Sequence, residues 1–145
     1  MTNIQAALGV AQMEELPEFI QRKQRNYELY KELFENFEYG KLIPFRKGTE
    51  SNKWFYSLDI DRNHIKISMR NIIIDLRNKG IETRPIWGLI NEQKPYEGEV
   101  AYKLDKAPYY ADRVLNIPSS TQITEEEIRY VSDEIKNLLK GLANG

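Results

Sequence analysis

Residues 2–40 constrain the fold most, because they read as one long helical segment that begins almost at the first residue. Thr2 and Gln5 have the spacing of a capping box, in which each side chain bonds the backbone amide of the other residue. Apolar residues then surround most of the helix, which predicts burial on several sides. These residues are Ile4, Ala6, Ala7, Leu8, Val10, Ala11 and Met13. Gly9 costs about 1 kcal/mol relative to Ala in mid-helix, so we expect a close neighbour there.

Apolar residues at helical spacing continue the pattern and predict a stripe that faces a core. The stripe comprises Leu16, Phe19, Ile20, Tyr27, Tyr30, Leu33, Phe34 and Phe37. Pro17 falls inside the pattern and predicts a kink or a restart of the helix. Gly40 predicts the left-handed residue that ends it.

The rest of the chain alternates short strands with helices. We expect a short extended piece and loop over 41–52 and a strand over 54–60, followed by a helix that ends in a Schellman motif at Gly80 and Ile81. The apolar residues of that helix are Ile65, Met69, Ile72, Ile73 and Leu76. A strand over 81–87, an irregular stretch over 88–108, a helical turn over 109–113 and a strand over 114–117 come next. The last helix starts at a Thr124–Glu127 capping box and is expected to fray over 141–145. Its expected core residues are Ile128, Val131, Ile135, Leu138 and Leu139. This order predicts an α/β (α+β) sandwich of one domain, in which helices cover a small sheet mainly on one face.

Composition excludes several classes of function. The 21 basic and 22 acidic residues leave no positive excess for a nucleic-acid backbone. The chain has no cysteine and a single histidine, His64, which excludes disulfides, thiolate sites and a metal site with several histidines. We see no apolar run that could span a membrane and no signal peptide, so we expect a reducing, cytoplasmic location and no membrane partner.

The usual catalytic templates also fail. There is no glycine-rich phosphate loop, and the carboxylates lie in helical charge runs that indicate solvated faces. His64 is read as a capping or solvent-facing residue rather than a member of a triad. No lysine stands in an apolar local setting that would lower its pKa for a Schiff base. Residue patterns alone therefore indicate no catalytic residue, and we expect no metal-ligating residue in this chain.

Residues 82–96 are the most informative stretch, because a predicted strand ends at Trp87 and is followed by amide side chains and Tyr96. Flat aromatic faces suit a sugar or a base, and Asn91 and Gln93 pair hydrogen-bond donors with acceptors. A turn-rich connection with a packed Trp explains the pattern equally well.

Three motifs resemble a known family. Residues 1–9 look like the segment that follows the G-Y-N-x-R motif in the DegT/DnrJ/StrS group of sugar-nucleotide aminotransferases, which use pyridoxal 5'-phosphate (PLP). Residues 80–87 resemble the family's G-I-x-T-R-P-x-W strand. Residues 115–120, followed by 124–128, resemble its L-x-L-P-S-S … T-E-E-E/D-I ending. The stretch 87–96 looks most like enzymes that aminate nucleotide-linked 4-keto-6-deoxy sugars of bacillosamine, legionaminic acid and perosamine type.

The resemblance implies that residues 1–145 are the C-terminal small domain of a fold-type I aminotransferase, with a mainly antiparallel sheet. The large domain with the Schiff-base lysine would lie upstream, so no residue here matches that lysine, and no PLP is expected on this chain alone. In the parent, glutamate would donate nitrogen to a nucleotide-sugar, and the enzyme would be a homodimer. The substrate contacts implied are Arg84, Trp87, Asn91, Gln93 and Tyr96.

One departure concerns the sugar. Many relatives carry His in a P-L-H-x-Q-P string, and Asn91 takes that position here, while Gln93 and Tyr96 match. An amide can still form hydrogen bonds but does not titrate near neutral pH. This departure affects which sugar is expected as substrate more than which class of reaction is expected.

Two further expectations concern the first helix. If the resemblance holds, the helix packs against the large domain, and the isolated chain self-associates through that surface. The alternative is a stand-alone interaction module that uses the same helix face to recruit a partner and has no enzymatic role.

Overall fold

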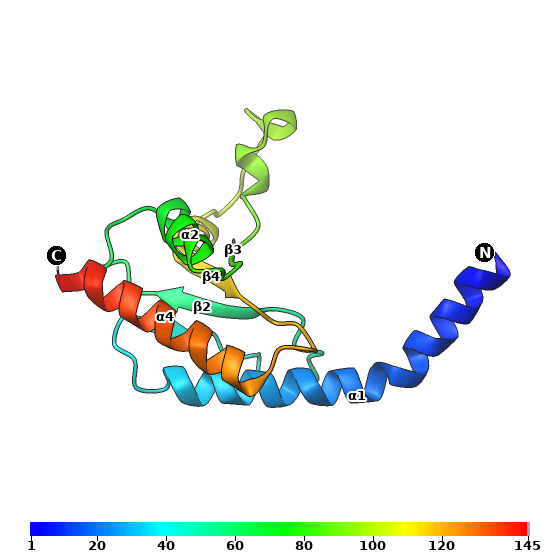
Figure 1. Ribbon diagram of the computed structural model, residues 1–145. Helices are drawn as coiled ribbons and strands as arrows, with labels where there is room; N and C mark the ends of the chain where they lie inside the picture. Colours follow the sequence, from blue (N-terminus) through cyan, green and yellow to red (C-terminus); the bar gives the residue numbers. More distant parts are fainter. Residues whose placement is uncertain (145) are drawn as a thin grey trace.

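The computed structural model describes residues 1–144 and contains one four-stranded antiparallel sheet. The strands lie in the order β1 (Gly40–Leu42), β2 (Tyr56–Ile60), β4 (Val114–Ile117) and β3 (Arg84–Pro85). In β2, buried residues alternate with partly exposed ones, so one face of the sheet carries the core. Side chains from α1 (Asn3–Phe34), α2 (Met69–Asn78) and α4 (Glu125–Asn144) complete that core. Figure 1 shows how these helices are arranged around the sheet. The predicted fold class is confirmed.

The first helix, α1, starts as its sequence predicts. The backbone N–H of Thr2 donates to Gln5 Oε1 at 2.9 Å, and the Gln5 N–H donates to Thr2 Oγ1 at 3.3 Å. Pro17 lies inside the helix, and Figure 1 shows α1 bent in its N-terminal half, as expected of a proline that removes a backbone bond.

The predicted end of α1 is wrong. The helix ends at Phe34 with Glu35 in a right-handed conformation, and Gly40 instead opens β1. Short-range bonds close the last turn, since the N–H groups of Glu35 and Phe37 donate to carbonyls three residues earlier. Phe37 is buried although it lies after the end of the helix, so the apolar stripe extends three residues beyond the helix that it predicts.

Residues 3–20 of α1 project away from the body of the protein (Figure 1). Their large apolar side chains are exposed except for that of Phe19, which is partly buried. Apart from the adjoining turns of α1 itself, no atom of the described residues lies within 4 Å of a Cβ placed on Gly9. The expected neighbour of this helix half is therefore not found within residues 1–144. The exposed side chains are Ile4, Leu8, Val10, Met13, Leu16 and Ile20.

Three elements in the middle of the chain are shorter than predicted. The strand expected over 54–60 begins at Tyr56, and Trp54 is exposed before it. The second helix begins at Met69, because the Ser68 hydroxyl caps it, and Ile65 is buried in the preceding loop. The strand expected over 81–87 shrinks to Arg84–Pro85, because Pro85 has no N–H to extend the ladder. The Schellman ending is confirmed: Gly80 has φ of 76°, and the Ile81 N–H donates to the Leu76 carbonyl at 3.0 Å.

The segment 87–111, here called the arm, connects β3 to β4, and its residues 87–105 project from the body (Figure 1). It contains two short 3-10 turns, Ile90–Glu92 and Lys94–Tyr96, and the helix α3 (Lys106–Ala111), which begins earlier than the turn predicted over 109–113.

The C-terminal elements match the sequence closely. The strand β4 has the predicted bounds, and the Thr124–Glu127 capping box opens α4. The predicted core residues of α4 are buried, with Leu138 partly so. The helix continues through Gly141 to Asn144, so fraying there is wrong, and Gly145 lies outside the described residues. None of the helices in residues 1–144 combines the length and apolarity needed to cross a bilayer.

Candidate functional site

A row of polar side chains crosses the sheet face opposite the core. The register places Ser57 beside Asn116, and Asn116 beside Arg84. Ser57 Oγ donates to Asn116 Oδ1 at 2.7 Å, and Asn116 Nδ2 donates to the Pro85 carbonyl at 3.4 Å. The Arg84 guanidinium, which is exposed, pairs with Glu82 at 2.8 Å. A fixed amide therefore lies next to a cation that an anionic ligand could reach.

A groove of about 640 Å³ adjoins this row, within the size range of small-molecule sites. It lies between the residues that lead into β3, the segment 118–123 after β4, and the first turns of α4. Buried Ile81, Ile117 and Val131 give it an apolar floor. Its rim is polar and carries charges of both signs, from Arg84, Glu82 and Glu127. The neutral polar residues there are Asn116, Ser119, Ser120, Gln122 and Tyr130.

Lys23 of α1 holds two of the segments that border the groove. Its Nζ donates to the Trp54 carbonyl at 2.8 Å and to the Ser119 carbonyl at 2.7 Å. The Ser119 hydroxyl also donates to the Trp54 carbonyl, at 2.9 Å. Partial burial lowers the pKa of Lys23 below the ordinary lysine value.

PLP needs a free lysine amine, a partner for its ring nitrogen and donors for its phosphate. No lysine lines the groove, and the amine of Lys23 is engaged by two carbonyls. A second polar cleft contains Lys41, but its volume of about 230 Å³ is small for such a ligand. Neither of these two cavities fits the cofactor.

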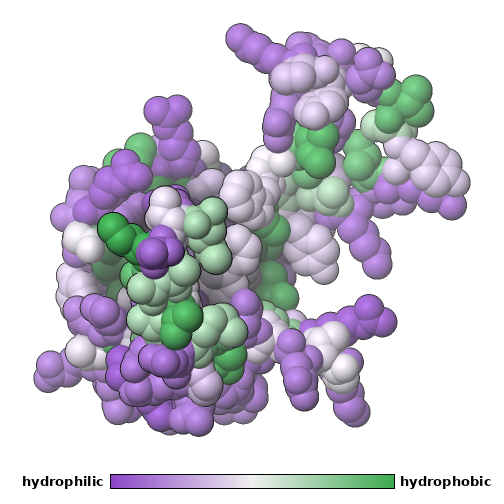
Figure 2. Space-filling model, turned by 90° about the vertical axis from the view of Figure 1, so that its right-hand side faces the viewer, coloured by the Kyte–Doolittle hydropathy of each residue, from purple (hydrophilic) through white to green (hydrophobic). Residues whose placement is uncertain are grey.

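The predicted substrate contacts divide between two places. Arg84 lies on β3 at the groove, whereas Trp87, Asn91, Gln93 and Tyr96 lie on the arm and line neither cavity described above. Trp87 is 73% exposed, and Tyr96 is 49% exposed. Figure 2 shows the arm standing apart from the body with hydrophobic side chains on its surface. The arm side chains are therefore free to meet a ligand or another surface.

Sequence reasoning missed Ser57, Asn116, Ser119 and Gln122. Asn116 and Ser119 belong to the 115–120 motif, but nothing in the sequence says that β4 pairs with both β2 and β3. Asn116 could have been singled out because it is a polar residue in a short apolar strand. A buried polar side chain needs a hydrogen-bond partner, so such a position indicates a polar contact.

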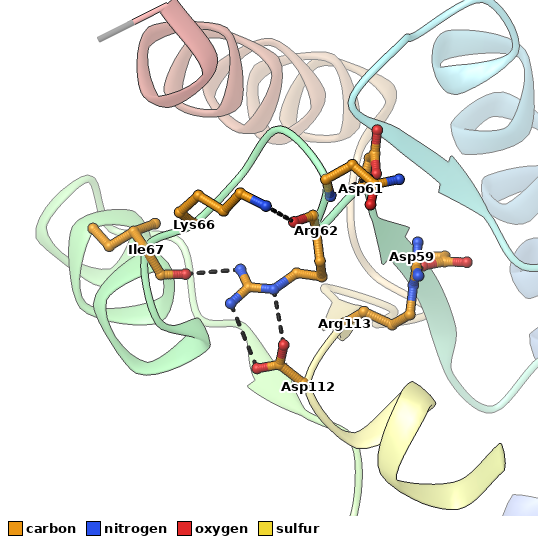
Figure 3. A network of polar contacts seen from close by, with 8 residues as sticks. Asp59, Asp61, Arg62, Lys66, Ile67, Asp112 and Arg113 are labelled. Carbon is orange, nitrogen blue, oxygen red and sulfur yellow. Dashed lines mark hydrogen bonds and ion pairs between the residues drawn. The ribbon is translucent and has the colours of Figure 1, made fainter. Parts of the chain in front are cut away.

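A polar network lies at the end of the arm where the chain re-enters the sheet (Figure 3). Arg62 Nε donates to Asp112 Oδ2 at 3.0 Å, and Arg62 Nη1 donates to the Ile67 carbonyl at 2.7 Å. Arg113 pairs with Asp59 of β2. This network joins the loop after β2 to the turn between α3 and β4.

His64 is half-exposed beside this network, and its Nδ1 lies 2.7 Å from Asp61 Oδ2. The N–H of Asn63 and the His64 ring hold the pKa of Asp61 below its ordinary value. Within residues 1–144, no three His, Asp or Glu side chains come together as ligands for a metal ion.

Comparison with known proteins gives a consistent match. Residues 1–136 match the DegT/DnrJ/EryC1/StrS aminotransferase family. The GDP-perosamine synthase of Escherichia coli O157:H7 is 29% identical over 141 residues, which cover 93% of this chain and 35% of that protein. The chain thus spans about a third of the length of the curated relatives it matches.

Solved structures agree with that match. DesI, solved with its TDP-sugar product, has a TM-score of 0.85 at 26% identity, over 92% of this chain and 34% of DesI. The PLP form of Spr1654 from Streptococcus pneumoniae has a TM-score of 0.85 at 21% identity, over 98% of this chain and 36% of that one, which shows a shared fold.

Proposed function

Because this chain belongs to the DegT/DnrJ/EryC1/StrS aminotransferase family, we propose that it forms the C-terminal small domain of a PLP-dependent sugar-nucleotide aminotransferase. The whole enzyme transfers an amino group from glutamate to the 4-keto carbon of a nucleotide-linked deoxy sugar, in the cytoplasm, for cell-surface glycan synthesis. The family match over 136 residues, with three motifs in family order, carries this proposal.

The cofactor supplies the amino-group chemistry when it is bound, and the protein binds and orients the substrates. The residues of this chain contribute to binding and orientation. Arg84 offers an exposed guanidinium to an anionic group, and the Asn116 amide beside it is held by Ser57. The arm adds aromatic faces from Trp87 and Tyr96, which suit a sugar ring or a base.

Asn91 and Gln93 are the polar contacts proposed for the sugar. Asn91 lies in the first 3-10 turn, and Gln93 joins that turn to the second. Each side chain pairs a donor with an acceptor, which matches sugar hydroxyls or an acetamido group. Because neither group titrates, sugar binding through them stays constant across neutral pH.

The test uses the full-length gene product with glutamate and nucleotide-linked 4-keto-6-deoxy sugars. We predict that Trp87→Ala raises the KM for the sugar about tenfold, because a stacking contact contributes roughly 1–1.5 kcal/mol. The control Trp54→Phe changes the other tryptophan, which lies outside the arm and β3. An unchanged KM in Trp87→Ala would remove the arm from the substrate site.

The projecting half of α1 is proposed as the surface that packs against the large domain of the enzyme. Most of its apolar residues over 3–20 are exposed, and Gly9 leaves room for close approach. In the isolated chain we expect the same surface to drive self-association, and in the enzyme we expect a homodimer.

The same exposed helix favours a second candidate, a stand-alone interaction module. The coding sequence upstream of Met1 distinguishes the two: an open frame encoding a Gly-Tyr-Asn motif and a Schiff-base lysine supports the enzyme.

A further inference from the structure

The arm is attached to the body almost entirely at its two ends. On the leading side, the Ile86 N–H donates to the Val114 carbonyl at 3.3 Å. On the returning side, the Ile60 N–H donates to the Arg113 carbonyl at 2.9 Å. Within residues 1–144, hydrogen bonds from residues 87–109 join only residues of the arm itself. The direction of the arm is therefore set by contacts near its ends.

Arg113 makes the contact that reaches farthest along the arm. Its guanidinium lies over the ring of Tyr109 in α3, with 4.3 Å between the guanidinium carbon and the ring centroid. The same guanidinium pairs with Asp59, which lies on β2. One side chain thus connects the last helix of the arm to a central strand of the sheet. Figure 3 shows Arg113 beside Asp59.

Burial separates this ion pair from the other one in the network. The side chains of Arg113 and Asp59 are 15% and 27% exposed, so solvent screens their attraction weakly. In the second pair, the Asp112 side chain is 64% exposed. Solvent screening therefore reduces the stabilisation that its ion pair with Arg62 provides. Arg62 also donates to the Ile67 carbonyl, so it ties the same end of the arm to the loop before α2.

We propose that Arg113, held by Asp59, is the residue that positions the arm relative to the sheet, with Arg62 as its weaker support. The proposal rests on the proposed function only for the role of the arm, which is to hold its aromatic and amide side chains at a fixed distance from Arg84. Arg113 acts through Tyr109 and the α3–β4 turn, so it is a positioning residue rather than a substrate contact.

The absence of cysteine from the sequence makes a direct test possible. Cysteines introduced as Gln93→Cys on the arm and Asp133→Cys on α4 carry two spin labels, and pulsed electron resonance gives the distribution of distances between them. The labelled chain is diluted with an excess of unlabelled chain, so that self-association adds no distances between molecules, and we expect a narrow distribution in the otherwise unaltered chain. Arg113→Gln and Asp59→Asn each broaden it at least about twofold, because the arm end is released while the core stays folded.

Three controls make the result specific. Arg113→Lys keeps the charge and restores a narrower distribution. Arg129→Gln removes an exposed ion pair on α4 and leaves it unchanged. A second label pair on the body, Arg25→Cys with Asp133→Cys, stays narrow in every variant.

Three outcomes would overturn the proposal. These are a broad arm distribution before any mutation, an unchanged distribution in both variants of the Arg113–Asp59 pair, or equal broadening of the body pair. If Arg113→Gln loses helix content, Asp59→Asn decides, since it keeps the size of the side chain. The measurement uses no substrate, so its failure leaves the proposed reaction standing, and failure of the reaction leaves the positioning result standing.

Discussion

Among single residues, Glu127 shows how one carboxylate stabilises the start of a helix. Its Oε2 accepts the Thr124 backbone N–H at 2.8 Å, while its own N–H donates to the Thr124 hydroxyl at 3.2 Å. The N–H and the hydroxyl of Thr124 lower the pKa of Glu127 below its ordinary value of 4.5. A carboxyl with a lowered pKa stabilises the fold above its unfolded pKa, and that contribution is lost as pH falls through the folded value.

We predict that Glu127→Gln changes how the stability of the protein depends on pH. The variant should lose less stability between about pH 7 and about pH 3 than the unaltered chain, because an amide does not titrate. Urea unfolding followed by far-UV circular dichroism at both pH values measures the difference. Glu126→Gln, one residue earlier on the same turn, is the control. Equal acid-induced losses in Glu127→Gln and the unaltered chain would show that the cap contributes nothing.

Local residue patterns could be predicted from the sequence because their partners lie within five positions. The two capping boxes and the Gly80 turn are such cases, and all three are confirmed. The row formed by Ser57, Asn116 and Arg84 could not be predicted, because its neighbours are 32 and 59 positions apart and only the strand register joins them.

Among the elements, α1 departs most from the usual relation between pattern and burial. Its second half buries Tyr27, Tyr30 and Phe34, whereas its first half is as apolar and yet exposed. An apolar sequence pattern predicts that a helix face is buried, but it does not identify the surface that buries it. The helix Asn3–Phe34 could thus be predicted in type and start, while its environment could not.

The prediction at this scale is that the isolated chain self-associates at high micromolar concentration through residues 3–20. The double variant Ile4→Gln/Leu8→Gln should weaken association at least about tenfold, because burying each apolar side chain contributes roughly 1.5–3 kcal/mol. Sedimentation equilibrium measures the association constant. The matched control Ile74→Gln changes an exposed apolar residue of α2 and should have no effect. A monomeric unaltered chain would contradict the expectation.

In the whole molecule, the sheet and its helices support the candidate site. The groove, Arg84 and the Ser57–Asn116 pair lie on the body, and the side chains proposed as aromatic and amide contacts lie on the arm. The fold class could be predicted from the order of elements. The extent of the arm could not, because α3 and the 3-10 turns are too short to leave a clear period.

We propose that this chain is part of an enzyme that moves nitrogen from glutamate to a nucleotide-linked keto sugar. Transfer of isotopically labelled nitrogen from glutamate by the gene product, purified from its source cell, tests this proposal. We predict that the label appears in an amine on the sugar ring, at the carbon that carried the 4-keto group. Absence of label from every nucleotide-linked 4-keto-6-deoxy sugar offered would contradict the claim.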